Sequence, residues 1–197
     1  MVNNTAGAHL GAIDGNYSGE ITKETSDGDH VTISYLNGKK HGITKFISSR
    51  GIVQSEISYE DDVIHGDVRQ YYPNGELMVV MTYVNGVQTG RFISYHTNGM
   101  KQVEANYDNG ELHGSFRTFD EFGDVIVEMM YARGQRNGES LLYYPKVQGG
   151  GVCESSIFRD GLLEGDKMTF SPSGKVMSVT RYKAGKAQAY PQYFNQS

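Results

Sequence analysis

The sequence predicts an all-β protein, built as an elongated, single-layer antiparallel meander of about seven tandem β-hairpins. Three observations support this fold class. Glycine recurs every 24 residues through most of the chain, a large aromatic residue follows at a fixed offset, and dipeptides such as Asn-Gly punctuate the sequence between short strand-like runs. Self-similarity at such a period is typical of repeat proteins, in which each unit contacts mainly its neighbours.

The glycine pattern defines seven units. The first glycine of a unit stands 24 residues after the previous one through the centre of the chain, with spacings of 23 at the start and 27 at the end. A second glycine follows nine residues later, or twelve in the sixth unit, and a third comes three residues after an aromatic. These positions hold 20 of the 25 glycines. The units start near Gly19, Gly42, Gly66, Gly90, Gly114, Gly138 and Gly165.

Each unit has the composition of one β-hairpin. In the third unit, a strand ending at Tyr71 is followed by Asn74-Gly75, by a strand over 77–83, and by Asn85-Gly86. Asn-Gly between apolar runs predicts a two-residue hairpin turn with both residues at positive φ, so we expect this conformation at both dipeptides.

The domain organisation follows from these units. Residues 19–188 form the seven hairpins, and residues 1–18 form an irregular or capping segment. Residues 189–197 resemble half of an eighth unit, with Ala189 in the glycine position, and are expected to cap the final edge. Unpaired edge strands accept further strands, so end-to-end association between copies is an open alternative.

Composition narrows the choice of partner and compartment. The net charge of −5 argues against nucleic acid and anionic membrane surfaces, and favours a basic partner. No apolar run approaches the length of a membrane span, so no integral membrane segment is expected. Cys153 is the single cysteine, which excludes an intrachain disulfide and suits the cytoplasm. A periplasmic or secreted location is the alternative if a leader has been removed.

The sequence offers no support for an enzyme, a cofactor or a metal site. His41, His65 and His113 share one slot of the repeat, so neighbouring members would lie two strands, or about 9–10 Å, apart. Zinc ligands must converge within about 2.3 Å of one point, so we assign these histidines a structural role. Cys153 has no nearby His or Lys to activate it, and the glycines at 149–151 lack the context of a phosphate loop.

Alternation along the second strands separates two faces. Positions in step with the aromatic are apolar, as at Leu77, Val79 and Met81, and the opposite face is mostly polar. Two units depart from this rule by placing apolar residues on the polar face. We therefore predict a partner-binding surface with these residues as anchors and two glutamates between them: Met78, Val80, Glu104, Ile126, Glu128 and Met130. The alternative is that segment 1–18 or the C-terminal tail covers the anchors.

The stretches "YVNGVQTGRFISYHTNG", "YDNGELHGSFRTF" and "YLNGKKHGITKF" resemble the MORN (membrane occupation and recognition nexus) repeat, and the fold would then be a MORN-like solenoid. The usual Tyr-x-Gly-x-Trp start is missing, so the units are nearer to the MORN variant. Strings such as "YYPNG" followed by Tyr-x-Asn-Gly are typical of YwqK-type bacterial antitoxins.

The resemblance implies a non-enzymatic, protein-binding antitoxin or immunity protein that neutralises a cognate toxin by occlusion. A basic toxin would suit the charge of the chain. Two alternatives stay open. One is a secreted effector or scaffold that binds a host or cell-envelope protein, and the other, suggested only by the name of the repeat, is binding to lipid surfaces.

Overall fold

The structure is a computed structural model that describes residues 13–194, and the chain divides into two compact units, residues 1–88 and 89–197. Each unit is considered by itself below. Residues 1–12 of the expected N-terminal segment, and residues 195–197 of the expected C-terminal cap, lie outside the described part.

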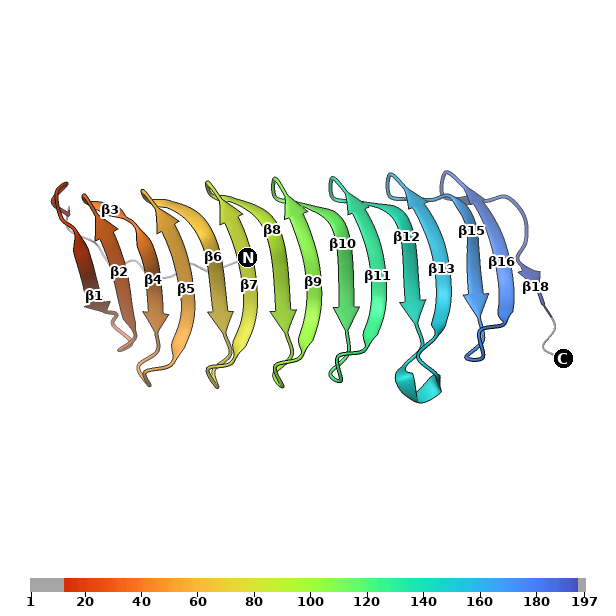
Figure 1. The fold of residues 1–197 in the computed structure, drawn as a ribbon, viewed down its shortest axis with the longest axis horizontal. Coiled ribbons are helices and arrows are strands. Elements are labelled where there is room, and N and C mark those ends of the chain that lie inside the picture. Colours follow the sequence, from red (N-terminus) through yellow and green to blue (C-terminus); the bar gives the residue numbers. More distant parts are fainter. Residues whose placement is uncertain (1–12, 195–197) are drawn as a thin grey trace. The chain divides into compact units, whose positions relative to one another are not determined.

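The first unit is an antiparallel sheet of three successive hairpins, β1–β2, β4–β5 and β6–β7 (Figure 1). Each hairpin also pairs with the next, β2 with β4 and β5 with β6. The strands are β1 (Gly19–Glu24), β2 (His30–Leu36), β3 (Lys39–Lys40), β4 (Gly42–Ile47), β5 (Val53–Glu60), β6 (Val63–Tyr71) and β7 (Leu77–Val84).

The second unit contains four hairpins, β8–β9, β10–β11, β12–β13 and β15–β16, which are also antiparallel. The strands are β8 (Val87–Tyr95), β9 (Lys101–Asp108), β10 (Glu111–Phe119), β11 (Val125–Ala132), β12 (Gln135–Tyr143), β13 (Val152–Arg159), β14 (Leu162–Leu163), β15 (Gly165–Phe170), β16 (Val176–Lys183), β17 (Lys186–Ala187) and β18 (Gln192–Tyr193).

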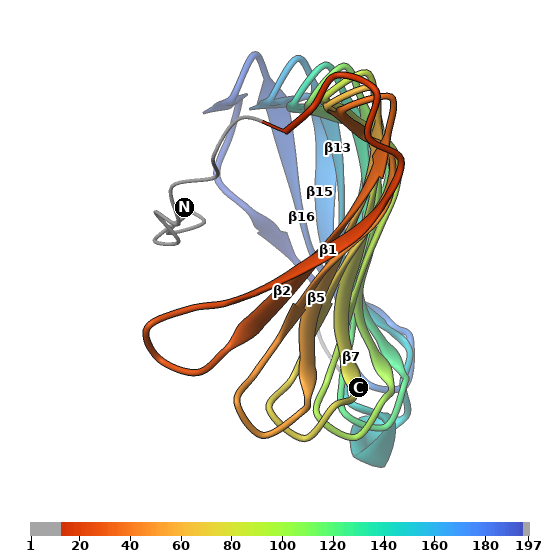
Figure 2. The ribbon, with the colours of Figure 1, turned by 90° about the vertical axis from the view of Figure 1, so that its left-hand side faces the viewer.

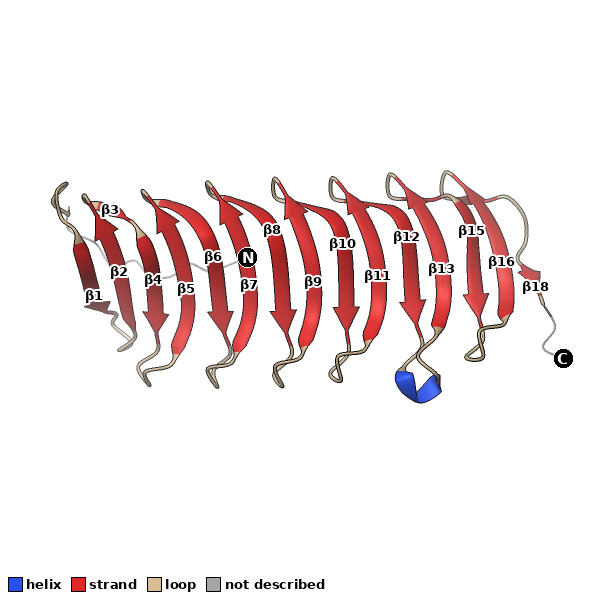
Figure 3. Cartoon of the chain, in the orientation of Figure 1, coloured by secondary structure: helices blue, strands red, loops and turns tan. Residues whose placement is uncertain are grey.

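The prediction of an all-β fold made of tandem antiparallel hairpins is confirmed (Figure 3). The described residues contain one helical element, the 3₁₀ turn η1 (Lys146–Gln148). It lies in the hairpin loop that is three residues longer than its counterparts, so the insertion folds locally and leaves the strands on both sides in place.

The two kinds of turn in each repeat differ in conformation. The turn after the aromatic is a two-residue turn with both residues at positive φ, as at Asn85 (φ 50°) and Gly86 (φ 81°), which is the conformation expected there. The expectation is wrong for Asn74-Gly75. The amide of Tyr72 donates to Glu76 and the amide of Gly75 to Tyr72, which defines a three-residue loop in which Gly75 takes the left-handed position (φ 87°). Such loops are the next most common in hairpins.

Backbone hydrogen bonds link tight turns to the hairpin before them in both units. The amide of Gly86 donates to the carbonyl of Ile64 (2.8 Å) and that of Gly134 to Leu112 (2.9 Å). The second of the seven hairpins ends with Asp62 where the others have glycine. Asp62 keeps the left-handed φ (69°), and its amide still donates to the carbonyl of Lys40 (2.9 Å). Its carboxylate also accepts the Lys40 amide (2.8 Å), so an aspartate replaces glycine without loss of the link.

The first glycine of each hairpin lies directly opposite the aromatic residue of that hairpin's second strand. This holds in all seven hairpins, from Gly19 opposite Tyr35 to Gly165 opposite Tyr182. The glycine has positive φ, for example 98° at Gly66, and the register shifts beside it, so it forms a bulge that bends the strand. Figure 2 shows the resulting curvature in β1, β2 and β5.

One face of each unit, the packed face, holds the buried strand residues. In the first unit they are Val31, Ile33, Tyr35, Thr44 and Val68. In the second unit they are Ser94, Ala105, Ser140, Ser156 and Phe158. Small side chains are buried here because rings of neighbouring strands lie over them, as in the pairs Phe92–Tyr107 (6.0 Å between ring centroids) and Phe116–Tyr131 (5.7 Å).

A second bulge, near the start of the second strand, places Leu77 on the face opposite to the one predicted for it. In the third hairpin Gln70 pairs with Val79 and Tyr71 with Leu77, which leaves Met78 without a cross-strand partner. Because one extra residue reverses the alternation, Leu77 lies with Tyr71, on the side opposite to the packed face. The same shift occurs in every hairpin from the second to the seventh, and its extra residues are Gln54, Met78, Gln102, Ile126, Cys153 and Met177.

The described ends of the chain pair with the outermost hairpins. The carbonyl of Tyr17 accepts the amide of Gly38, as Ile64 accepts Gly86, and the Tyr17 ring packs on Tyr35. At the other end, β17 and β18 pair with β16. Residues on both sides of the seven hairpins therefore imitate parts of a further repeat.

Substitution of Gly66 by alanine should lower the free energy of unfolding by about 2 kcal/mol, because alanine is strained at positive φ. Its Cβ would also lie 3.1 Å from that of Ser58. Gly51→Ala is the matched control, with φ 81° and no atom within 4 Å of the added Cβ, and should lose about 1 kcal/mol. Urea denaturation measures both, and equal losses would contradict the role of the close approach.

Candidate functional site

The face opposite the packed face, here called the charged face, carries a row of ionic side chains. In the first unit the register places Lys45, Glu56, Arg69 and Val80 side by side on four adjacent strands. Lys45 Nζ lies 3.1 Å from Glu56 Oε1, and the hydroxyl of Tyr71 donates to Glu56 Oε2 at 2.8 Å. Glu56 therefore joins its own hairpin to the next.

In the second unit, considered by itself, the register places Ile93, Glu104, Arg117, Glu128 and Leu141 side by side in an equivalent row. Glu104 accepts hydrogen bonds from Arg91 (3.0 Å) and Lys101 (3.2 Å). Arg117 Nε lies 2.7 Å from Glu128 Oε1, and the hydroxyl of Tyr143 donates to Glu128 Oε2 at 2.7 Å. These pairs are partly exposed, so each contributes less than about 1 kcal/mol.

These contacts shift several pKa values. The hydrogen bond from Tyr71, helped by Lys45, lowers the pKa of Glu56 in spite of partial burial. Partial burial works against the charged form of Glu104, but the bonds from Lys101 and Arg91 outweigh it and lower its pKa. Partial burial and the bond to Glu128 raise the pKa of Tyr143 to about 12. The carboxylates are thus held ionised and the tyrosines neutral, as interstrand acceptors and donors.

The predicted binding residues fall into separate groups. In the first unit, Val80 lies on the charged face opposite Arg69, and Met78 is the extra residue of the bulge. Both side chains are half-buried, although described residues form a single sheet layer there. In the second unit, Glu104 and Glu128 lie in the charged row.

The structure places Glu128 and Met130 beside one shallow depression of about 120 Å³ on the second unit. Met130, opposite Ser115, is 44% exposed, and Ile126, at the bulge of β11, is 41% exposed. Sequence reasoning missed Ser115, Arg117, Glu139 and Leu141, which also line the depression. These four residues lie on the first strands of their hairpins, β10 and β12. Comparison of equivalent positions in the first strand of every hairpin, as well as in the second strand, could have found them.

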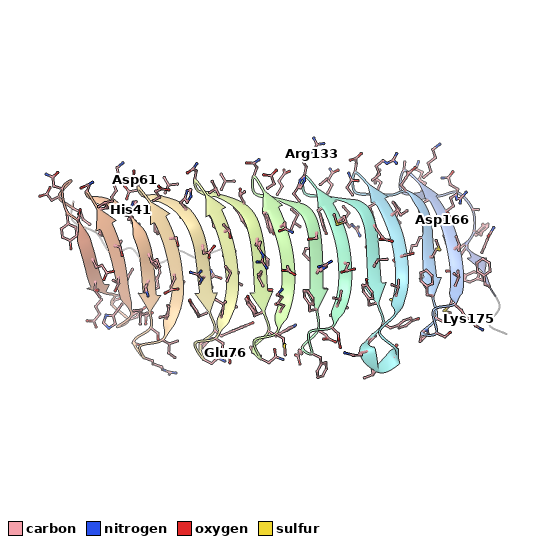
Figure 4. The ribbon with its side chains drawn as sticks, in the orientation of Figure 1. His41, Asp61, Glu76, Arg133, Asp166 and Lys175 are labelled. Atoms are coloured by element: carbon pink, nitrogen blue, oxygen red, sulfur yellow. The ribbon has the colours of Figure 1, made fainter. Side chains whose placement is uncertain are left out.

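His41 and His65 lie beside tight turns and contact residues of the next turn. His41 Nδ1 lies 3.6 Å from Asp61 Oδ1, and the two side chains are visible together in Figure 4. His65 Nδ1 lies 3.3 Å from Asn85 Oδ1 of the next turn. Within residues 13–194, no group of three or more His, Cys, Asp or Glu side chains is arranged to hold a metal ion.

Two further polar groups, the carboxylate of Asp120 and the thiol of Cys153, lie in a turn and at a bulge. Asp120 Oδ1 accepts the amides of Phe122 and Asp124, so this carboxylate closes its own turn. Cys153 is a half-buried free thiol at the bulge of β13. No helix in the described part of the chain is long and apolar enough to cross a membrane.

Tandem hairpins with a packed face and a charged face define a repeat module of the binding type. Residues 64–85 and 88–109 match the MORN repeat variant, so the chain carries MORN-variant repeats there. Repeats of this kind are generally non-catalytic and typically bind proteins. No curated protein is similar enough in sequence to count as a relative.

Substitution of Tyr71 by phenylalanine should raise the pKa of Glu56 toward its ordinary value, because the strongest contact that lowers it is removed. The loss of unfolding free energy should be about 1 kcal/mol. Carboxyl ¹³C NMR over an acid titration measures the pKa. Tyr83→Phe, on the packed face, is the control, and an unchanged Glu56 in Tyr71→Phe would contradict the assignment.

Tyr143 should make stability depend on alkaline pH. Its folded pKa is raised to about 12, so its contribution is complete below the unfolded value of about 10 and is lost as the pH rises toward 12. Urea denaturation between pH 9.5 and 12 should show a shallower loss for Tyr143→Phe than for the unmodified chain. Parallel curves would show that the hydroxyl is not coupled to folding.

Proposed function

We propose that this protein is an antitoxin or immunity protein that binds a cognate protein toxin and neutralises it by covering the toxin surface. The observation that carries the proposal is the exposed apolar side chain of Met130. Its equivalents in the other hairpins are the polar residues Ser34, Ser58, Thr82, Asn106 and Arg181, and one further exposed apolar residue, Ile157. Methionine adapts well to a partner surface, and exposed apolar residues among polar ones are typical of interfaces.

The distribution of charge supports a basic partner. Residues 1–88 carry eleven acidic and six basic side chains, and residues 89–197 carry twelve of each. The net negative charge therefore comes from the first unit, which also contains the predicted residues Met78 and Val80. Complementary charge accelerates association, so a basic surface of the toxin would face this unit during encounter.

The proposal is tested by co-expression. The reading frame beside the gene for this chain, expressed alone, should stop growth, and co-expression of the chain should restore it. The two purified proteins should form a stoichiometric complex whose association rate falls as salt is added. A harmless neighbour, or a toxic one that the chain neither binds nor neutralises, would overturn the proposal. We place the complex in the cytoplasm, and fractionation of the producing cells tests this location.

The anchors can be tested by restoring the residues of other units. Met130→Ser and Ile126→Gln install the side chains of Ser58 and Gln102, so both variants should fold. Loss of a partly buried apolar anchor should weaken toxin binding about tenfold per site.

Met78→Gln and Val80→Glu make the corresponding changes in the first unit, where Val80→Glu would also give Arg69 an acidic neighbour. Val147→Ser, at a 94% exposed loop position, is the control and should bind normally. Isothermal calorimetry measures all five variants. Unchanged affinity in the four anchor variants would remove these residues from the interface.

A further inference from the structure

The residue that follows the first glycine of a hairpin is acidic in four of the seven hairpins, and three of these carboxylates have partners within the chain. Glu20 accepts a hydrogen bond from the hydroxyl of its cross-strand residue, Ser34 (3.3 Å). Asp67 is bound by Arg69 (2.6 Å) and by the hydroxyl of Thr82 (3.2 Å). Asp166 receives two hydrogen bonds from Arg181, at 2.7 and 2.9 Å, and lies on β15 in Figure 4. In all three hairpins the partner includes the cross-strand residue, Ser34, Thr82 or Arg181.

Glu139 is the remaining acidic residue in this slot, and its cross-strand residue is Ile157. Ile157 cannot donate a hydrogen bond, and no residue within 13–194 forms an ion pair or a hydrogen bond with the Glu139 side chain. Arg117, which lines the same depression, is bound to Glu128 at 2.7 Å. Glu139 is therefore an exposed carboxylate without a hydrogen-bond or ion-pair partner among the described residues, whereas its three counterparts each have one.

Apolar groups lie on both sides of this carboxylate. Met130, on β11, lines the depression and is 44% exposed. Ile157, on β13, lies opposite Glu139 and is 51% exposed. Leu141 adds a third apolar side chain to the lining. This place therefore combines a carboxylate without a counter-ion and exposed apolar side chains on the neighbouring strands.

We propose that Glu139, Met130 and Ile157 form a docking site for a lysine or arginine side chain of a partner protein. The cationic group pairs with the Glu139 carboxylate, and the long methylene stem, with an adjacent aliphatic residue, packs on Met130 and Ile157. Charge complementarity selects this occupant, because an acidic or purely apolar segment would leave Glu139 unpaired. The inference rests on the proposed function insofar as the partner is a protein.

A peptide titration tests the site without the natural partner. The probe is acetyl-Gly-Leu-Lys-Leu-Gly-amide, added to the full chain with ¹³C-labelled Met and Ile methyl groups. The methyl signals of Met130 and Ile157 should shift, and matched peptides with norleucine or glutamate in place of lysine should bind about three- to fivefold more weakly. Glu139→Gln should weaken the lysine peptide by the same factor. Asp166→Asn, at the same slot of another unit, should leave it unchanged.

The inference is overturned if these methyl signals do not respond to millimolar peptide, if the norleucine peptide binds equally well, or if Asp166→Asn has the effect of Glu139→Gln. A toxin that binds Glu139→Gln with full affinity would also overturn it, while the proposed function would stand. Failure to find any toxin would sink the proposed function, and the peptide result would still decide the chemistry of the site.

Discussion

A backbone hydrogen bond from the last residue of the tight turn to a carbonyl of the preceding hairpin recurs along the chain and underlies the repeat. It requires the left-handed conformation, which explains glycine in six of the seven third positions and the tolerance of Asp62 in the remaining one. Tyr17 supplies the same acceptor for the first turn. Because these bonds fix a hairpin to the one before it, successive hairpins within each of the two units pair in one register, as expected for a repeat protein.

The two faces follow from this stacking. On the packed face, the small residue Ala105 is buried opposite Phe92, whose ring packs on Tyr107, so a sheet with few fully buried side chains still removes apolar area from water. On the charged face, carboxylates such as Glu56 and Glu128 accept hydrogen bonds from a tyrosine of the next hairpin. A face that satisfies itself in this way leaves its exceptions, Met130 and Glu139, available to a partner.

The repeat period and the residues it fixes made the fold predictable, because glycine at positive φ and Asn-Gly turns have few alternatives. The bulges were not predictable. The loop closed by Tyr72 and Glu76 adds no residue to the repeat, so nothing in its spacing shows that Met78 loses its partner and that Leu77 changes face. The predicted residue Met130 lines the depression of the second unit, whereas Glu139 was missed because its isolation depends on the cross-strand neighbour, Ile157.

Native-state hydrogen exchange, followed residue by residue by NMR, tests the coupling of the hairpins most directly. The amides of Gly86, Gly134 and Gly161 bond to the preceding hairpin, and those of Gly75 and Gly123 bond only within their own turns. The first set should exchange as slowly as the strand amides, because opening requires neighbouring hairpins to separate, and the second set should exchange by local fraying. Equally fast exchange in the two sets would contradict the account.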